Sequence, residues 1–514
     1  MKRAISAVLA IIMTIINIAA FAENTPPPKP DGQDENTPPM MGEMGTPPDG
    51  FGGDGMEQPP QGNVPMGTPP GGFGGDGMGQ PLQGGAPMDM PPGGFGGGPG
   101  GQSSKPDSYA AVSSYAEDTE VNHETIESTG KDEIVILVTD GTVMISDSSL
   151  TRASADSSGG DSASFYGVGA AVLTTGGTVK VENCVIDTDA AGGAGVFAYG
   201  DGVAYVSDCT ITTKQGTSGG IHVAGGGTLY ASNLTVVTDG GSAAAIRSDR
   251  GSGTMVVTGG SYTSNGSGSP AVYVTADITI SDADLTATGS EALCLEGLNS
   301  IKLYNCNLTG NMPDLSQNDN TWTVILYQSM SGDAQIGEGA FLMEGGTLTS
   351  ENGGIFYTTN TDSVFTLNHV QIVAADDSEY LLRCTGNSNA RGWGRSGSNG
   401  ANCVFNAINQ VLNGNVIYDS ISNLTVNLTE GSVLTGAVID DESCAGEGGS
   451  GVCKLTIDAS SKWIVTEDSR LGVLKNHGSI LDADGKEVTI MDAAGNVLRQ
   501  GTGSVIVTVD EYQE

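Results

Sequence analysis

One set of positions in this sequence carries side chains that are well suited to bind a sugar. Aromatic rings stack on sugar rings, and a guanidinium group pairs with carboxylates. Each of these side chains follows a small residue and an aliphatic one, as in Gly220-Ile221-His222 and Ala245-Ile246-Arg247. Leu173 and Cys294 occupy equivalent positions, and the predicted ligand-binding residues are Phe197, His222, Arg247, Tyr273 and Phe356.

A repeated motif predicts how the chain places these side chains. The motif alternates apolar and polar residues, continues with Asn or Asp, and adds an apolar residue soon after; its clearest copy is TVKVENCVIDT, residues 178–188. It returns about every 24 residues, and such a period is typical of a solenoid. The Asn, Asp or Gly lies at positions 147, 183, 208, 233, 259, 282, 305 and 345, with a His at 369.

Each period contains about three short β-type runs separated by Gly, Asn, Asp and Ser, without a helical period. This pattern predicts an all-β fold, a parallel β-helix in which stacked coils bring equivalent residues about 4.8 Å apart. The inward columns must then be apolar. One runs through Val143, Val179, Ala204, Leu229, Met255, Ile278, Ile301, Phe341 and Phe365, and the other, two residues later, runs from Ile145 through Val181 to Leu367.

The alternation of strand residues also fixes the expected direction of the ligand-binding set. If Val196, Ile221 and Ile246 point inward, their next neighbours point outward and form one exposed file along the helix. The alternative is that this file lies under a loop or is ordinary surface. Such loops are expected at residues 153–164, 311–339 and 387–401, and the last of these carries Trp393 and Arg395.

The coil motif resembles that of secreted right-handed parallel β-helix repeat proteins of Gram-positive anaerobic bacteria. These proteins are pectate-lyase-like in fold and often adhesin-like. The runs at residues 393–400 and 419–428 share the resemblance, which extends over about residues 106 to 514. It implies a right-handed parallel β-helix and an adhesin-like recognition function. The resemblance is specific for architecture, because members of such a group share a scaffold rather than a site.

The same resemblance implies an alternative function, a calcium-dependent polysaccharide lyase that acts on a uronate polymer. In pectate-lyase-like enzymes, acidic residues hold Ca²⁺ against the uronate while an arginine abstracts the proton. The candidates here are Arg247, Asp249 and Arg250, which lie at one turn. The carboxylates that should accompany them on neighbouring coils are few, and the nearest equivalents are Asp201 and Glu296. A third alternative is a non-catalytic structural component of the cell surface.

No metal site and no cofactor are predicted, and Ca²⁺ is the only ion considered. None of the four histidines, His123, His222, His369 and His477, pairs with Cys or carboxylate residues at metal-ligand spacing.

The chain divides into five predicted segments. Residues 1–22 are a signal peptide, with Lys2 and Arg3 before an apolar run and Ala20-Phe21-Ala22 as the cleavage site. Residues 23–105 are a disordered linker rich in Pro, Gly and Met, in which residues 45–66 repeat as 67–88. An N-terminal cap at 106–132, the β-helix at 133–440, and C-terminal coils with a cap at 441–514 follow. We expect export to the cell surface or medium, without membrane insertion after cleavage.

Eight cysteines in an exported chain suggest disulfides. Cys184 and Cys209 hold the same position of consecutive coils, which places them about 4.8 Å apart and within bridging range. The predicted pairs are Cys184 with Cys209, Cys294 with Cys306, Cys384 with Cys403, and Cys444 with Cys453. The alternative is a ladder of buried thiols.

The net charge of −40 excludes several classes of partner. A chain this acidic is repelled by nucleic acids and by anionic membranes, whereas the charge suits a soluble secreted protein. We therefore expect a secreted or cell-surface recognition protein whose partner is an extracellular polysaccharide or a host or cell-surface glycan.

Overall fold

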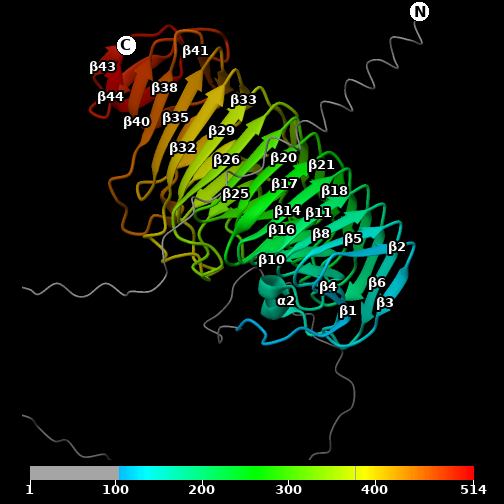
Figure 1. Cartoon of the computed structure of the whole chain (residues 1–514). Coiled ribbons are helices and arrows are strands. Elements are labelled where there is room, and N and C mark those ends of the chain that lie inside the picture. Colours follow the sequence, from blue (N-terminus) through cyan, green and yellow to red (C-terminus); the bar gives the residue numbers. More distant parts are fainter. Residues whose placement is uncertain (1–103, 377) are drawn as a thin grey trace, which may run out of the picture. The chain divides into compact units, whose positions relative to one another are not determined.

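The computed structural model describes residues 104–376 and 378–514, and Figure 1 shows them in sequence colours. The predicted signal peptide and nearly all of the predicted linker lie outside the described residues. Within the described part, the chain winds through successive coils of three strands, and each strand pairs in parallel with its equivalents in the coils before and after it. The parallel β-helix predicted from the sequence is therefore confirmed. Among the described helices, none has the length and apolar character needed to cross a membrane.

Three long parallel sheets, A, B and C, form the walls of the helix. Sheet A has 13 strands. Its strands are β1 (Ala111–Tyr115), β4 (Ile134–Val138), β7 (Val172–Thr174), β10 (Val196–Tyr199), β13 (Ile221–Ala224), β16 (Ile246–Ser248), β19 (Val272–Val274), β22 (Leu293–Glu296), β25 (Trp322–Tyr327), β28 (Gly354–Thr359), β31 (Leu382–Cys384), β34 (Val416–Tyr418) and β37 (Val438–Asp440).

Sheet B contains the motif strands and continues to the C-terminus. Its strands, in order of pairing, are β2 (Thr119–Asn122), β5 (Thr142–Ser146), β8 (Thr178–Glu182), β11 (Val203–Ser207), β14 (Gly227–Ser232), β17 (Gly253–Thr258), β20 (Asp277–Ser281), β23 (Ser300–Tyr304), β26 (Glu338–Glu344), β29 (Asp362–Asn368), β32 (Asn402–Ile408), β35 (Asn423–Thr429), β38 (Cys453–Ile457), β40 (Ser469–Asn476), β44 (Ile506–Gln513), β42 (Thr489–Asp492) and β43 (Val497–Arg499). The pairing of β42 with β43 is antiparallel.

Sheet C forms the third wall, and sheet D takes that place in the last coils. The 10 strands of sheet C are β3 (Thr125–Ser128), β6 (Ser149–Ser154), β9 (Val185–Ala190), β12 (Thr210–Thr213), β15 (Thr235–Thr238), β18 (Ser261–Ser264), β21 (Asp284–Ala287), β24 (Asn307–Gly310), β27 (Thr347–Ser350) and β30 (Gln371–Val373). The 4 strands of sheet D are β33 (Val411–Asn413), β36 (Val433–Thr435), β39 (Lys462–Val465) and β41 (Ser479–Asp482).

The register of sheet B confirms the predicted inward columns. Val179 lies beside Val143 in one neighbouring coil and beside Ala204 in the other, and Leu229 follows Ala204. These side chains are buried in one core cluster that runs through the coils. The corners are also as expected, because Asn183 and Asp208 both have a φ of 53°. Asn and Asp tolerate this left-handed conformation better than other non-glycine residues do.

Several segments differ from the prediction. Residues 106–132 do not form a separate cap, because β1, β2 and β3 make a complete first coil that pairs with β4, β5 and β6. The loop expected at 153–164 contains the start of a helix, α2 (Gly160–Tyr166), and the loop expected at 311–339 contains strand β25. A 3₁₀ turn, η1 (Glu442–Cys444), follows β37, the last strand of sheet A.

The predicted disulfides are not formed, because all eight cysteines are free thiols. Cys294 and Cys306 point in different directions, because Cys294 belongs to a cluster outside sheet A, whereas Cys306 lies in the interior core. Cys444 and Cys453 lie in different parts of the coil, since Cys444 is on η1 and Cys453 is buried inside sheet B. Cys384 and Cys403 both lie in the interior core, on sheets A and B.

Cys184 and Cys209 are adjacent, but their thiols serve the backbone of the corner. The Sγ of Cys209 donates to the carbonyl of Ser207 at 3.0 Å and accepts from the amide of Cys184 at 3.3 Å. Ser148 does the same in an earlier coil, where its Oγ donates to the carbonyl of Ser146 and accepts from the amide of Glu124. A left-handed corner leaves this amide without a ladder partner, and the side chain of the next coil supplies one. The buried thiol ladder is therefore the better description.

Candidate functional site

The predicted ligand-binding residues do form one column along sheet A, with the exception of Phe356. Phe197, His222, Arg247, Tyr273 and Cys294 are successive partners in sheet A. Phe356 does not belong to the file. It pairs with Val324 and Leu382 and packs in the interior against Phe365, at 5.3 Å between ring centroids. Tyr357 takes the expected place. All six residues of β28 are buried, so hydrophobicity alone did not reveal which ones face outward.

The expected exposure of this file is wrong. Phe197 and Tyr273 are 0% exposed, His222 is 1% and Arg247 is 2%. The ring of Phe197 stacks on that of His222 at 4.0 Å, so these two rings already occupy one face of each other. Segments inserted between the coils cover the outer face of sheet A, and α2 is one of them. As it stands in this structure, the file has no surface on which a glycan can lie.

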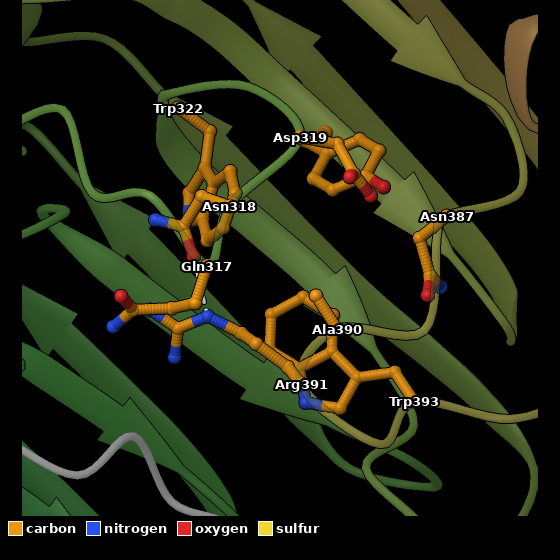
Figure 2. Close-up of a pocket in the computed structure, with 9 residues that line it drawn as sticks. Gln317, Asn318, Asp319, Trp322, Asn387, Ala390, Arg391 and Trp393 are labelled. Atoms are coloured by element: carbon orange, nitrogen blue, oxygen red, sulfur yellow. Dashed lines mark hydrogen bonds between the residues drawn. The ribbon is translucent and has the colours of Figure 1, made fainter.

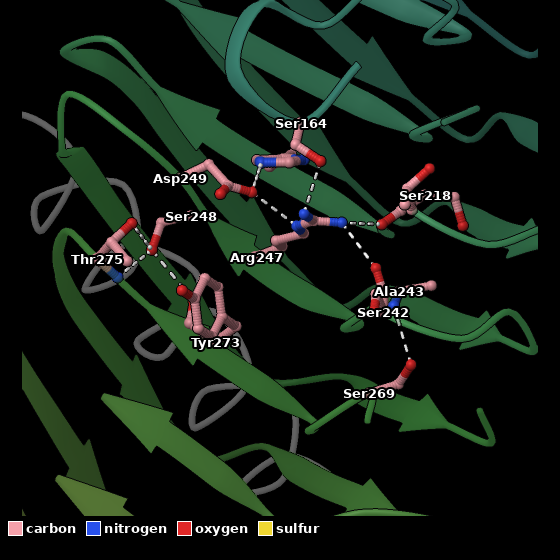
Figure 3. A network of polar contacts seen from close by, with 12 residues as sticks. Ser164, Ser218, Ser242, Ala243, Arg247, Ser248, Asp249, Ser269, Tyr273 and Thr275 are labelled. Atoms are coloured by element: carbon pink, nitrogen blue, oxygen red, sulfur yellow. Dashed lines mark hydrogen bonds and ion pairs between the residues drawn. The ribbon is translucent and has the colours of Figure 1, made fainter. Parts of the chain in front are cut away.

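Arg247 joins α2 to the coils beneath it (Figure 3). Its Nε donates to Asp249 Oδ2 at 2.8 Å, and its Nη2 donates to Ser164 Oγ, on α2, at 2.7 Å. Its Nη1 donates to the carbonyls of Ser218 and Ser242, at 2.9 and 2.8 Å. A guanidinium group that is buried and bonded on every nitrogen can neither abstract a proton nor receive a carboxylate from solvent.

His222 shares Asp249 with Arg247. Its Nε2 lies 3.2 Å from Asp249 Oδ2. Burial lowers the pKa of His222 to about 4, the hydrogen bond to Asp249 opposes this change, and the charge of Arg247 adds to it. The imidazole is therefore neutral near pH 7 and serves packing against Phe197.

Arg250 also links covering segments on the outer face of sheet A. Its Nη2 donates to Asp333 Oδ1 at 2.8 Å, and its guanidinium lies over the ring of Phe165, 4.1 Å from the centroid. Phe165 is on α2 and Asp333 is in the loop after β25, so Arg250 links two inserted segments that are far apart in sequence. The set Arg247, Asp249 and Arg250 proposed for a lyase thus holds the covering segments in place.

The two carboxylates considered alongside that set do not complete it. Glu296 is buried on β22, and its Oε2 accepts from the hydroxyls of Tyr273 and Tyr327 at 3.1 and 3.2 Å. Burial raises its pKa. Asp201 is exposed in the turn after β10. Within the described part of the chain, no three His, Cys, Asp or Glu side chains are grouped so that they could hold a metal ion.

A cleft elsewhere on the outer side of sheet A brings aromatic and polar groups together (Figure 2). Two inserted loops, residues 311–321 and 385–401, supply most of its walls, and the strands β25 and β28 contribute one aromatic residue each. We call it the aromatic cleft; the space between its walls, open solvent included, is about 220 Å³, and the enclosed part has room for about one water molecule. It is lined by Gln317, Asn318, Asp319, Trp322, Tyr357, Asn387, Ala390, Arg391 and Trp393.

The aromatic rings of the cleft form one cluster. The ring centroids of Trp322 and Tyr357 are 5.3 Å apart, and those of Trp322 and Trp393 are 6.0 Å apart. Tyr327 supports Trp393 from below at 4.5 Å. The guanidinium of Arg391 lies 5.4 Å from the centroid of Trp393. These contacts hold the rings in fixed orientations, as a recognition site requires.

Polar contacts tie the two loops to each other across the cleft. Arg391 Nε donates to Asn318 Oδ1, and the amide of Ser388 donates to Asp319 Oδ2 at 2.7 Å. Asn387 Nδ2 donates to Thr359 Oγ1 at 2.9 Å, which anchors the second loop to β28. Asn318 and Arg391 therefore meet on one side of the cleft, whereas the carboxylate of Asp319 lies apart from them, toward Asn387 (Figure 2).

The loops around the cleft were predictable from the sequence, but this site was not. Trp393 was noted in its Gly-, Ser- and Asn-rich loop, whereas Trp322 was expected in a loop and lies on β25. The missed signal was composition: the chain has only 3 Trp, and two of them fall in or next to insertions that interrupt the regular period. The third, Trp463, is 0% exposed in the core.

Comparisons with known proteins identify no family for this chain. No family model matches it, and no curated protein matches it.

Proposed function

We propose that this chain is a secreted or cell-surface recognition protein, adhesin-like in role, that binds a glycan at the exposed rim of the aromatic cleft. The observation that supports this proposal is that Asn318, Asp319 and Arg391, which solvent reaches, lie beside the rings of Trp322, Tyr357 and Trp393 on the outer side of sheet A. Small-ligand sites typically combine an apolar aromatic lining with a few placed polar groups. Sugars match this chemistry, because a pyranose has an apolar face and a rim of hydroxyls.

The scaffold suits such a function. Loops carry binding residues, and a rigid framework beneath them keeps those residues in position. Here the framework is sheet A, where β25 and β28 pair in parallel directly below the cleft. The expected signal peptide and linker fit a protein that displays its β-helix away from a surface. Its acidic charge also suits a partner that is neither nucleic acid nor an anionic membrane.

The lyase and the purely structural alternatives receive less support. Arg247, Asp249 and Arg250 are committed to holding α2 and the loop after β25. A purely structural component predicts neither glycan binding nor turnover, and the polar groups of Asn318, Asp319 and Arg391 beside the aromatic rings favour recognition over it. We therefore propose recognition without catalysis.

A glycan array tests this proposal with the whole exported chain. We expect binding to a defined group of glycans, and we expect Asp319→Asn and Trp393→Ala each to weaken it about tenfold or more, which corresponds to about 1.4 kcal/mol. Asp319 is exposed, so its substitution leaves folding intact even if loss of Trp393 disturbs its loop. Tyr205→Ala is a matched aromatic control, because Tyr205 stacks on Tyr230 on the outer face of sheet B, away from the cleft.

Three outcomes contradict the proposal. The first is an array without any binding. The second is binding that is indifferent to Asp319→Asn and Trp393→Ala. The third is the release of unsaturated uronate products from pectin or alginate with Ca²⁺, which shows a lyase instead.

A further inference from the structure

We infer that the β-helix has a second binding site, a groove beside sheet C that receives a short neutral oligosaccharide. The groove is lined by Thr129, Ala153, Ser154, Ala155, Asp189, Ala191 and Gln215, and we call it the polar groove. None of these residues lines the aromatic cleft, so this site goes beyond the proposed function. The inference is carried by the space in the groove, by its free hydrogen-bonding groups and by its charge.

The polar groove exists because two strands of sheet C are longer than their neighbours. β6 and β9 have 6 residues each, whereas β3 and β12 have 4 each. The pairing of β6 with β3 ends at Arg152, and the pairing of β9 with β12 ends at Thr188. Ala153 and Asp189 pair with each other beyond these ends, and both line the groove.

The segment between β6 and α2, both labelled in Figure 1, supplies one wall of the groove and is fixed in place. Arg152 is buried beneath this segment, and its Nη2 donates to Ser157 Oγ at 2.6 Å. Ser158 donates to the carboxylate of Asp132 with both its amide and its hydroxyl, at 2.6 and 2.9 Å. The groove is therefore formed before any ligand arrives, as precise recognition requires.

The polar groove is large enough for more than one sugar ring. The space in it that water can occupy is about 570 Å³, and small-ligand sites usually measure about 300–1,000 Å³. Its side chains are small, because three of the seven lining residues are Ala and two more are Thr129 and Ser154. Thr129, Ala155, Asp189 and Gln215 are exposed, so a ligand reaches them from solvent.

The polar groups of the groove are available to sugar hydroxyls. Gln215 Nε2 donates to Asp189 Oδ1 at 2.6 Å, and this bond holds a carboxylate and an amide side by side. Asp189 Oδ2 and the hydroxyls of Thr129 and Ser154 form no hydrogen bond with any described residue. Neighbouring sugar hydroxyls each donate and accept, so they match a carboxylate that accepts beside an amide that does both.

The charge of the groove favours a neutral sugar. Asp189 is the only charged residue among the described residues that line it. Lys214, which precedes Gln215 in the sequence, pairs with Asp187 at 3.0 Å and so does not neutralise the groove. A carboxylate without a cation beside it repels uronates and sulfated sugars, whereas it accepts a hydroxyl donor from a neutral ring.

The strand edge at the groove is too short to receive a peptide instead. Past the end of its pairing with β3, β6 continues only through Ala153 and Ser154. Strands usually have about 3–10 residues, so the addition of a peptide strand finds too few backbone partners here. The free side-chain groups therefore decide the class of ligand.

Calorimetric titration of the whole chain with trisaccharides tests the inference. The neutral probes are cellotriose, xylotriose, maltotriose and mannotriose, and trigalacturonate is the anionic probe. We expect at least one neutral trisaccharide to bind, and we expect Gln215→Ala to weaken that binding about tenfold or more. Ala155→Trp fills the groove at an exposed position without removing a polar group, and it should weaken the same probe as strongly. Gln215→Ala should leave the titration with trigalacturonate unchanged.

A second carboxylate–amide pair gives the matched control. Asn265 Nδ2 donates to Asp239 Oδ1 at 2.8 Å, and Asp239 holds the position of Asp189 two coils later. Neither residue of this second pair lines the polar groove. Asn265→Ala should therefore bind the probe as the native chain does. The inference is overturned if no neutral trisaccharide binds, or if Gln215→Ala and Asn265→Ala have the same effect.

The outcomes for the two sites are distinguishable. Trisaccharide binding that needs Asp319 and Trp393 but not Gln215 overturns the polar groove and keeps the proposed function. Binding that needs Gln215 but not Trp393 supports the polar groove, and the glycan array with Asp319→Asn then decides the proposed function separately.

Discussion

At the scale of single residues, the fate of an arginine depends on how many partners surround it. Arg247 has the most suggestive neighbours in the sequence, yet the structure gives its three guanidinium nitrogens to Asp249, Ser164 and two carbonyls. Arg391, in an unremarkable Gly-rich run, keeps its charge unpaired in the described structure. The sequence made Arg247 a candidate site residue because its neighbours along the chain are visible there. The partners that inserted segments bring to Arg247 in space are not visible in the sequence.

The buried imidazole of His222 gives a pH prediction at the same scale. Its pKa falls from 6.5 to about 4 on folding, chiefly through burial. Below about pH 6.5 His222 binds a proton in the unfolded chain but not in the folded chain. The free energy of unfolding therefore falls as pH decreases from about 6.5 to about 4. The maximum loss is about 3 kcal/mol. We expect urea unfolding of His222→Gln to lose less stability than the native chain between about pH 7 and about pH 4.5.

The choice of glutamine makes this test specific. Glutamine keeps a donor for Asp249, which the native structure shares between His222 and Arg247, but it has no proton to gain. His369→Gln is the matched control, since His369 lies at an exposed corner, where its Nδ1 is 3.1 Å from Asn409 Nδ2. If the native chain and His222→Gln lose stability in parallel over this interval, the imidazole is not the titrating group.

At the scale of elements, the coils were predictable and their covering was not. The columns through Val179 and Val181 could be read from the sequence because every coil repeats the same alternation, and the register follows. Helix α2, with residues 160–166, occurs once, so no repetition reveals it. The predicted exposure of the residues from Phe197 to Tyr273 was wrong for the same reason. Alternation shows which way a side chain points, but the inserted segments decide whether solvent reaches it.

The same contrast explains the two errors of detail. The position of Phe356 was misassigned because β28 is buried on both of its faces, so its outward residue, Tyr357, looks as apolar as its inward one. The cysteine pairs failed because sequence position gives the spacing of Cys184 and Cys209 but not the hydrogen bonds that hold each thiol against a backbone carbonyl.

The link between the inserted segments gives a prediction about dynamics. Arg250 connects Phe165 on α2 with Asp333 in the loop after β25. We expect Arg250→Ala to accelerate amide hydrogen exchange in residues 155–168 and 328–337, because local opening then breaks fewer contacts. The melting temperature should change little, since the coils beneath do not depend on this contact.

Arg470→Ala is the matched control for this experiment. Arg470 also pairs with an aspartate at 2.8 Å, but the pair joins β40 to β44 and touches neither inserted segment. Exchange in 155–168 and 328–337 should remain native in this variant. Unchanged exchange in Arg250→Ala, or equal acceleration in both variants, means that Arg250 does not fasten the covering segments.

At the scale of the whole molecule, stability comes from repetition. Each coil buries its apolar columns against the next, so the free energy of folding is approximately a sum over neighbouring coils. The interior cluster is continuous from Val121 in the first coil to Val509 in the last strand. Such a core grows with the number of coils and has no need of the covalent cross-links on which small exported domains depend.

The state of the cysteines tests this account of the whole chain. With every cysteine a free thiol, seven buried and Cys444 partly exposed, we expect the purified chain, unfolded without reductant, to titrate eight thiols. Only Cys444 should react in the folded chain, and slowly, because burial raises the pKa of its thiol. Cys444→Ser should remove that reaction and leave the other thiols protected. Reductant should not lower the unfolding midpoint, because no cross-link restricts the unfolded chain. Fewer than eight thiols, or a midpoint that falls on reduction, means that disulfides form after all and that stacked coils alone do not account for the stability of the fold.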